Sequence, residues 1–136
     1  MTRFFLSSHG HLASGLKSSI DILLGSSSRL TVFDAYVDED SLEARLDGFY
    51  RELDPDDQVV LMSDMYGGSV NSVMYTFLDR PNTTLIAGVN LALVIGLLVN
   101  EETLSRESIE EVIRQSREAL RVVELDAGEE GEEELF

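Results

Sequence analysis

The two histidines of this chain, His9 and His11, lie where a short apolar run, RFFLSS, gives way to a helical pattern. A histidine between a strand and a helix faces unpaired backbone N–H groups, and these groups stabilise an anion. The same positive field disfavours imidazolium, so we expect His9 to be neutral near pH 7. A neutral imidazole has one bare nitrogen, which acts as a nucleophile or a base.

A carboxylate follows a later apolar run, QVVLMSD, which ends at Asp64. If these two runs are neighbouring strands, Asp64 can accept the proton of one ring nitrogen of His9 and leave the other nitrogen free. A carboxylate plays this orienting role in catalytic triads. A single Asp at a strand end is also common as a helix cap or a loop residue, so the pairing depends on strand order.

The segment that follows Asp64 contains Gly67, Gly68 and Ser69 and opens a predicted helix. Two glycines let the backbone approach an anion closely, and the serine hydroxyl can donate to it. We expect the helix starts near residues 10 and 69 to stabilise a phosphoryl group. Alone, the segment is a turn before a helix, and a lone histidine is often a surface residue. Their co-location at strand ends favours a nucleophilic histidine beside a phosphate-binding loop.

The second histidine, His11, lies one residue into the predicted helix, so we expect it on the surface without a role in the chemistry.

The predicted site around His9, Asp64 and Ser69 holds no metal, because no further ligands cluster near these residues.

The elements that must position these residues alternate between two periodicities. Strand-like runs cover residues 3–8, 29–36, 58–64 and 83–88. Between and after them lie helical patterns, with predicted caps at Asp40, in a capping box with Glu43, and at Ser105. The first helix has the apolar stripe Leu12, Leu16, Ile20, Leu23 and Leu24 and ends at Gly25; the last has Ile109, Val112, Ile113 and Leu120. Residues 90–99 read as a buried short helix, and RVVEL at 121–125 could form a last strand.

This order of elements predicts an open, three-layer α/β sheet that is mainly parallel, with right-handed crossovers. Ligands bind such sheets beyond the carboxyl ends of the strands. The turns to inspect are therefore SSHG, DEDS, SDMYGGSVN and AGVNL.

Composition sets the class of protein. The 136 residues suit one domain, at 1–125, and an acidic, flexible tail, at 126–136. The absence of Cys excludes disulfides and thiolate chemistry. No signal peptide or transmembrane stretch is visible, so we expect a soluble cytoplasmic protein. The net charge of −16 argues against binding to nucleic acid.

Three motifs, SSHGHLASGL, LMSDMYGGSVNSV and LIAGVNLALV, resemble the IIA component of the mannose–fructose–sorbose family of the bacterial phosphoenolpyruvate-dependent sugar phosphotransferase system. The resemblance covers roughly residues 3–125. It implies that His9 is phosphorylated, that Asp64 holds its ring, and that Gly10, Gly67, Gly68 and Ser69 line the phosphoryl site. It also implies sheet order 2-1-3-4, with an antiparallel fifth strand exchanged between the subunits of a homodimer.

The implied function is a phosphoryl carrier that accepts the group from phospho-HPr on His9 and passes it to a IIB component during sugar uptake. No cofactor is implied, and contact with the membrane is indirect, through the IIC/IID permease. Two positions depart from the family pattern, because Val70 and Ala92 stand where prolines are expected. Pro at a helix start only pre-organises it, so Val70 should be tolerated. These changes allow a different sugar or partner.

Other functions stay open at this stage. A non-catalytic regulatory or binding module could keep this fold, and a IIA-like subunit serves dihydroxyacetone kinase. The double glycine argues against that subunit. A phosphatase or mutase of the Arg-His-Gly type is disfavoured, because Ser8 precedes His9 and no remote histidine exists. HGHLASG does not match a dinucleotide-binding Gly-x-Gly-x-x-Gly, and a response-regulator receiver would need an acidic pair after the first strand.

Overall fold

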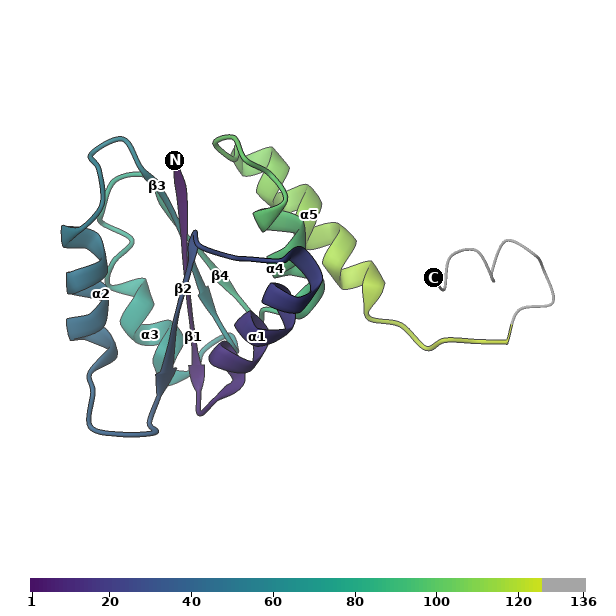
Figure 1. The fold of residues 1–136 in the computed structure, drawn as a ribbon, viewed down its shortest axis with the longest axis horizontal. Helices are drawn as coiled ribbons and strands as arrows, with labels where there is room; N and C mark the ends of the chain where they lie inside the picture. Colours follow the sequence, from purple (N-terminus) through teal and green to yellow (C-terminus); the bar gives the residue numbers. More distant parts are fainter. Residues whose placement is uncertain (126–136) are drawn as a thin grey trace.

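A single four-stranded parallel sheet forms the centre of the molecule (Figure 1). The structure is a computed structural model, and it describes residues 1–125. The strand order is β2-β1-β3-β4. The strands are β1 (Thr2–His9), β2 (Leu30–Ala35), β3 (Gln58–Ser63) and β4 (Thr83–Ala87). All three pairings are parallel, so the four carboxyl ends lie at the same edge of the sheet.

Helices cover both faces of this sheet and complete three layers (Figure 1). They are α1 (Leu12–Leu24), α2 (Leu42–Arg51), α3 (Ser69–Tyr75), α4 (Leu91–Leu98) and α5 (Arg106–Ala119). α1, α4 and α5 pack on one face, and α2 and α3 pack on the other. The prediction of an open α/β sheet of order 2-1-3-4 is confirmed.

Strand β3 shows why the sheet is buried on both sides. Val60 and Met62 point into the cluster under α1, α4 and α5, whereas Val59 and Leu61 point into the cluster under α2 and α3. Successive side chains of a strand alternate between faces, so a strand covered on both sides is apolar throughout. None of the helices within residues 1–125 is long and apolar enough to cross a bilayer.

The predicted helix ends are partly confirmed. Gly25 ends α1 with a φ of 86°, a left-handed conformation that suits glycine, and the Ser105 side chain caps α5. The prediction for α2 is wrong by one residue: the cap is Ser41, whose hydroxyl accepts from the Ala44 N–H. A cap at Ser41 leaves no capping box with Glu43, because that partner must lie three residues on.

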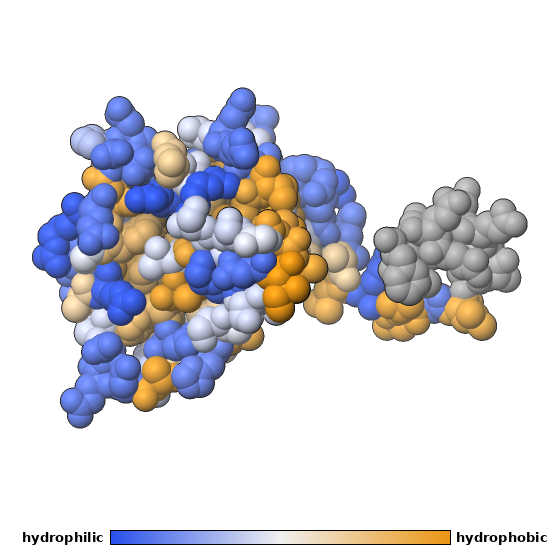
Figure 2. Space-filling view, viewed as in Figure 1, coloured by the Kyte–Doolittle hydropathy of each residue, from blue (hydrophilic) through white to orange (hydrophobic). Residues whose placement is uncertain are grey.

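Three predicted core positions of α1 and one of α5 are instead exposed. Leu12, Leu23 and Leu24 have exposed side chains, and so does Leu120. These residues lie at the ends of their helices, beyond the area that the sheet covers. Figure 2 shows an apolar patch over the end of α1, where Ile22 and Leu23 are exposed.

The segment 121–125 forms no strand within this single copy, and it runs away from the sheet (Figure 1). Its Val122, Val123 and Leu125 side chains are exposed. Exchange with a second copy stays a prediction. The acidic tail at 126–136 lies outside the described residues.

Candidate active site

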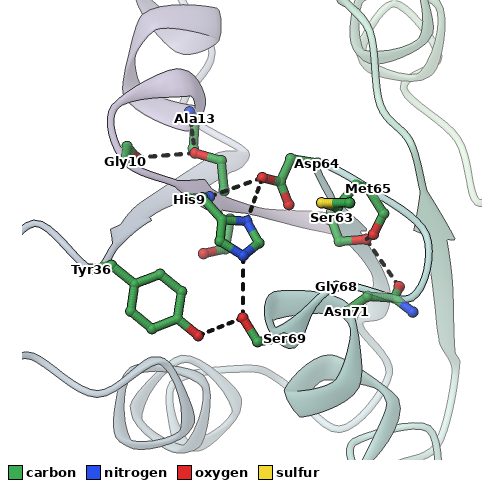
Figure 3. A network of polar contacts seen from close by, with 12 residues as sticks. His9, Gly10, Ala13, Tyr36, Ser63, Asp64, Met65, Gly68, Ser69 and Asn71 are labelled. Carbon is green, nitrogen blue, oxygen red and sulfur yellow. Dashed lines mark hydrogen bonds and ion pairs between the residues drawn. The ribbon is translucent and has the colours of Figure 1, made fainter.

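The sheet brings His9 and Asp64 together, because β1 and β3 are neighbours. In their register Ser7 is opposite Ser63, so both residues lie at the carboxyl edge. The Asp64 Oδ2 lies 2.7 Å from the His9 ring Nδ1 and also accepts the His9 backbone N–H at 2.9 Å. The carboxylate therefore orients both the ring and the main chain of the histidine (Figure 3).

Asp64 is ionised at neutral pH. Its burial alone would raise its pKa, but the hydrogen bonds from the His9 backbone and ring outweigh burial and hold the pKa below its usual range. An ionised carboxylate only accepts, so the neutral ring must carry its proton on Nδ1. The lone pair of the ring is therefore on Nε2. The second carboxylate oxygen, Oδ1, is buried and has no hydrogen-bond partner within residues 1–125.

Ser69, at the start of α3, faces the free nitrogen of His9. Its Oγ lies 3.2 Å from Nε2, so the serine hydroxyl donates to the ring. Gly68 makes this approach possible. A Cβ at Gly68 would lie 3.3 Å from the His9 Cε1 and 2.8 Å from the Met65 Cγ, so a side chain there would crowd the ring. Gly67 precedes it with a φ of 77°, which forms the turn.

Tyr36 is the site residue that sequence reasoning missed. Its hydroxyl lies 2.6 Å from the Ser69 Oγ, and its ring centroid is 5.3 Å from that of His9 (Figure 3). The sequence pattern placed Tyr36 inside a strand, but β2 ends at Ala35. The signal that could have found it is its position, since the first residue after a parallel strand faces the ligand edge.

The start of α1 holds an anion of the protein itself. The Ala13 N–H donates to the Ser8 hydroxyl at 2.7 Å, and the Ser14 N–H donates to the Asp34 carboxylate at 2.9 Å. These two amides are therefore already paired, and the binding of a phosphoryl group by the other amides of this helix start stays a prediction. Gly10 forms the turn with a φ of 65°, and its N–H donates to the Ala35 carbonyl.

His11 is exposed, as expected, but it has a carboxylate partner of its own. Its Nδ1 lies 3.0 Å from the Asp34 Oδ2. Burial would raise the pKa of Asp34, but hydrogen bonds from Ser14 and from His11 hold it below the usual range. The His11 side chain is 79% exposed, whereas the His9 side chain is 40% exposed, so the two His–Asp pairs differ in their surroundings.

The structure thus joins four of the predicted site residues, His9, Asp64, Gly68 and Ser69, and adds Tyr36 through hydrogen bonds. Gly10 and Gly67 shape the turns beside them. Within residues 1–125, no group of three or more acidic or histidine side chains could hold a metal ion.

The fold and the site define an α/β protein with a carboxylate-paired histidine at the carboxyl edge of a parallel sheet. Residues 3–117 match the family model described as the PTS system fructose IIA component, EIIA-man, where PTS is the sugar phosphotransferase system. The match covers most of the chain, and the chain belongs to this family. The family supports a general phosphotransferase role, so the resemblance in the sequence is confirmed.

Solved structures agree with this family. A protein of Klebsiella pneumoniae subsp. pneumoniae, described as a phosphoenolpyruvate-dependent sugar phosphotransferase system permease, is 29% identical with a TM-score of 0.82; the match covers 89% of this chain and 90% of that one. A mannose/sorbose-specific IIA subunit from Enterococcus faecalis is 22% identical with a TM-score of 0.81, over 93% and 98% of the two chains. The second likeness shows the fold. No curated protein sequence matches the chain.

Proposed function

We propose that this protein is a phosphoryl carrier. The Nε2 of His9 accepts the phosphoryl group of phospho-HPr and then passes it to a IIB component during sugar uptake. The carrier would act in the cytoplasm, on the cytoplasmic side of a IIC/IID permease. Membership of the IIA family supports the general role, and the site geometry supports this particular route.

The observation that carries the proposal is that the two ring nitrogens of His9 have different partners. Nδ1 is bound to Asp64, and Nε2 faces the edge of the site with only a serine hydroxyl on it. The ring is 40% exposed, so a donor imidazole on another protein can reach it. Nδ1 cannot be the acceptor while it carries the proton that Asp64 holds.

The transfer is a displacement at phosphorus. The Nε2 lone pair forms the new N–P bond, and the electron pair of the broken N–P bond returns to the donor imidazole. The His9 ring keeps its Nδ1 proton and becomes positively charged. The adjacent Asp64 carboxylate stabilises that charge, since it lies 2.7 Å from Nδ1.

Exposed apolar side chains near the site support docking of a protein donor. Leu12 follows the turn after β1, Val37 follows β2, and Met65 follows β3, and each has an exposed side chain. Apolar side chains at a site rim are typical of surfaces that bind proteins. The chain also has an excess of acidic residues, which favours a basic partner surface.

We also propose that the protein is a homodimer in which residues 121–125 of one copy pair with β4 of the other. In the described part of the chain nothing pairs with the outer edge of β4. A groove of about 710 Å³ runs along β4 and is lined on its far side by Ile109 and Ile113 of α5. An unpaired edge beside a partly apolar groove favours an added strand.

Radiolabelled phosphoenolpyruvate with enzyme I and HPr tests the carrier proposal. We expect an acid-labile, alkali-stable label on the wild-type chain, which is the behaviour of phosphohistidine. The variant His9→Ala should take no label, and the matched control His11→Ala should take nearly the wild-type amount. A IIB component added afterwards should remove the label.

The outcomes separate the alternatives. An unlabelled wild-type chain would contradict the carrier proposal and favour a regulatory or binding module. A label that passes to dihydroxyacetone kinase and not to IIB would favour the kinase-associated subunit. Equal loss of label from both histidine variants would contradict the assignment of His9 as the acceptor.

A further inference from the structure

Tyr36 is held beside the imidazole of His9 in a strained conformation. Its φ is 67°, in the left-handed region that bulky residues rarely occupy. Its ring is tilted by 36° to that of His9, and its side chain is 65% exposed. Little hydrophobic burial offsets this strain. Such strain occurs mostly at functional sites, where the surrounding structure holds a residue in place.

The hydroxyl of Tyr36 belongs to a chain of hydrogen bonds with a fixed direction. Asp64 accepts the Nδ1 proton of His9, so the Nε2 lone pair accepts the single proton of the Ser69 hydroxyl. Ser69 has no second proton, so at 2.6 Å the Tyr36 O–H must be the donor and Ser69 the acceptor. The order of donation is Tyr36 to Ser69 to Nε2 (Figure 3).

This chain of hydrogen bonds occupies the nitrogen that must attack phosphorus. Once Nε2 forms an N–P bond, its lone pair is gone, and it accepts no hydrogen bond. The Ser69 hydroxyl then loses its acceptor, and the chain of hydrogen bonds from Tyr36 to Ser69 to Nε2 is broken. Both hydroxyls now face the three phosphoryl oxygens, which share the negative charge. No proton leaves either hydroxyl, because both groups only redirect the hydrogen bonds that they donate.

We propose that Tyr36 is a phosphoryl-binding residue, and that Tyr36 and Ser69 turn from the ring nitrogen to the phosphoryl oxygens when His9 is phosphorylated. This inference rests on the proposed function, because it names a further residue of the same site. The tyrosine also holds Ser69 in place while the ring is free.

The charge of the site supports neutral donors in this role. In the described residues, no Arg or Lys forms an ion pair or hydrogen bond with His9, Asp64, Ser69 or Tyr36. Neutral hydroxyls bind phosphoryl oxygens less strongly than a guanidinium does. A carrier must release the group again, so weak neutral donors orient the phosphoryl group without trapping it.

The variant Tyr36→Phe tests this role because it keeps the aromatic ring and removes only the hydroxyl. The measurement is the equilibrium ratio of phosphorylated chain to phosphorylated HPr. A hydrogen bond to a charged acceptor is stronger than one to serine, so we expect the ratio to fall about 5-fold. The matched control is Tyr66→Phe, which removes a hydroxyl from an 86% exposed tyrosine and should leave the ratio unchanged.

Two NMR readouts separate phosphoryl binding from a merely structural effect. In the phosphorylated state, the phosphorus resonance of Tyr36→Phe should move from its wild-type position. In the free state, the Nε2 nitrogen resonance of His9 should move downfield, because Ser69 donates to it less firmly. Circular dichroism establishes that the variant is folded.

The outcomes are distinguishable from failure of the carrier proposal. If the wild-type chain takes no phosphoryl group on His9, the proposed function fails. If the wild-type chain is phosphorylated and Tyr36→Phe keeps the wild-type equilibrium ratio and phosphorus resonance, the role of Tyr36 fails alone. If Tyr66→Phe lowers the equilibrium ratio as much as Tyr36→Phe does, the role of Tyr36 also fails.

Discussion

The substitution Asp64→Asn replaces the carboxylate that orients His9 with an amide of the same shape. The Oδ2 of Asp64 accepts two N–H groups of His9, at 2.7 and 2.9 Å. If the amide oxygen takes this place, both hydrogen bonds remain but lose their charge. If the NH₂ takes it, the ring must carry its proton on Nε2, and the nucleophile is lost.

The magnitude follows from these contacts. Only an interaction that strengthens as the ring becomes positively charged affects the rate, so the bond from the His9 backbone N–H does not count. A hydrogen bond between the charged ring and a charged carboxylate contributes about 1.5 to 3 kcal/mol. The positive ring that forms on phosphorylation also loses its counter-charge. We expect transfer from phospho-HPr to slow about 100-fold, which corresponds to about 2.7 kcal/mol. Because both hydrogen bonds to Oδ2 lose their charge, the free energy of unfolding should fall by about 1 to 3 kcal/mol.

The assay is rapid-quench measurement of phosphoryl transfer from phospho-HPr, with urea unfolding of the same samples. The chain supplies a matched control in Asp34→Asn, because Asp34 contacts the Nδ1 of His11 at 3.0 Å in the same way. That variant should transfer at the wild-type rate. Transfer by Asp64→Asn within about twofold of wild type, a difference below about 0.5 kcal/mol, would refute the orienting role. Equal slowing in both variants would refute its specificity.

Three further predictions concern stability and assembly. Asp34 has a lowered pKa in the folded chain, so its contribution is present above its unfolded pKa of about 3.9 and is lost as pH falls through the folded value. Asp34→Ala should therefore lower the free energy of unfolding by about 1 kcal/mol at about pH 7 and much less at about pH 3, measured with urea; a constant difference would contradict the capping role. Gly96→Ala should lower the free energy of unfolding by about 1 to 2 kcal/mol, because a Cβ there would lie 2.7 Å from the Val112 Cγ1. Adding Val112→Ala to the same chain should recover the lost stability. A thermal melt of Gly96→Ala that is unchanged from wild type would contradict this packing. Sedimentation equilibrium should show a wild-type dimer and a monomeric Val123→Asp variant, whereas a monomeric wild type would refute strand exchange.

Much of the fold could be predicted from local patterns. The alternation of strand and helix periodicities defined all nine elements of residues 1–125, and the apolar run at β3 indicated a sheet covered on both faces. Burial imposes these periods on the sequence, so they can be read without coordinates. Element ends were less predictable. The cap of α2 is Ser41 and not Asp40, because both residues suit a cap and only the path of the chain selects one.

The site could be predicted in part, for a related reason. His9 ends β1, Asp64 follows β3 and Ser69 opens α3. The rule that parallel strands share a carboxyl edge placed them together. Asp34 was missed because it lies inside β2, where the pattern suggests only packing. Its role at the start of α1 depends on how β2 lies beside β1.

The sequence by itself determined the class of fold, and it predicted the edge of the sheet and the histidine at which we expect the chemistry. These properties depend on residue type, order and local period. Only the tertiary structure decided which polar groups meet. The register of β1 with β2 places the Asp34 carboxylate beside the His11 ring. The left-handed backbone at Tyr36 brings its hydroxyl to Ser69. Such contacts join residues more than 20 positions apart, and no local preference encodes the register and loop geometry that create them.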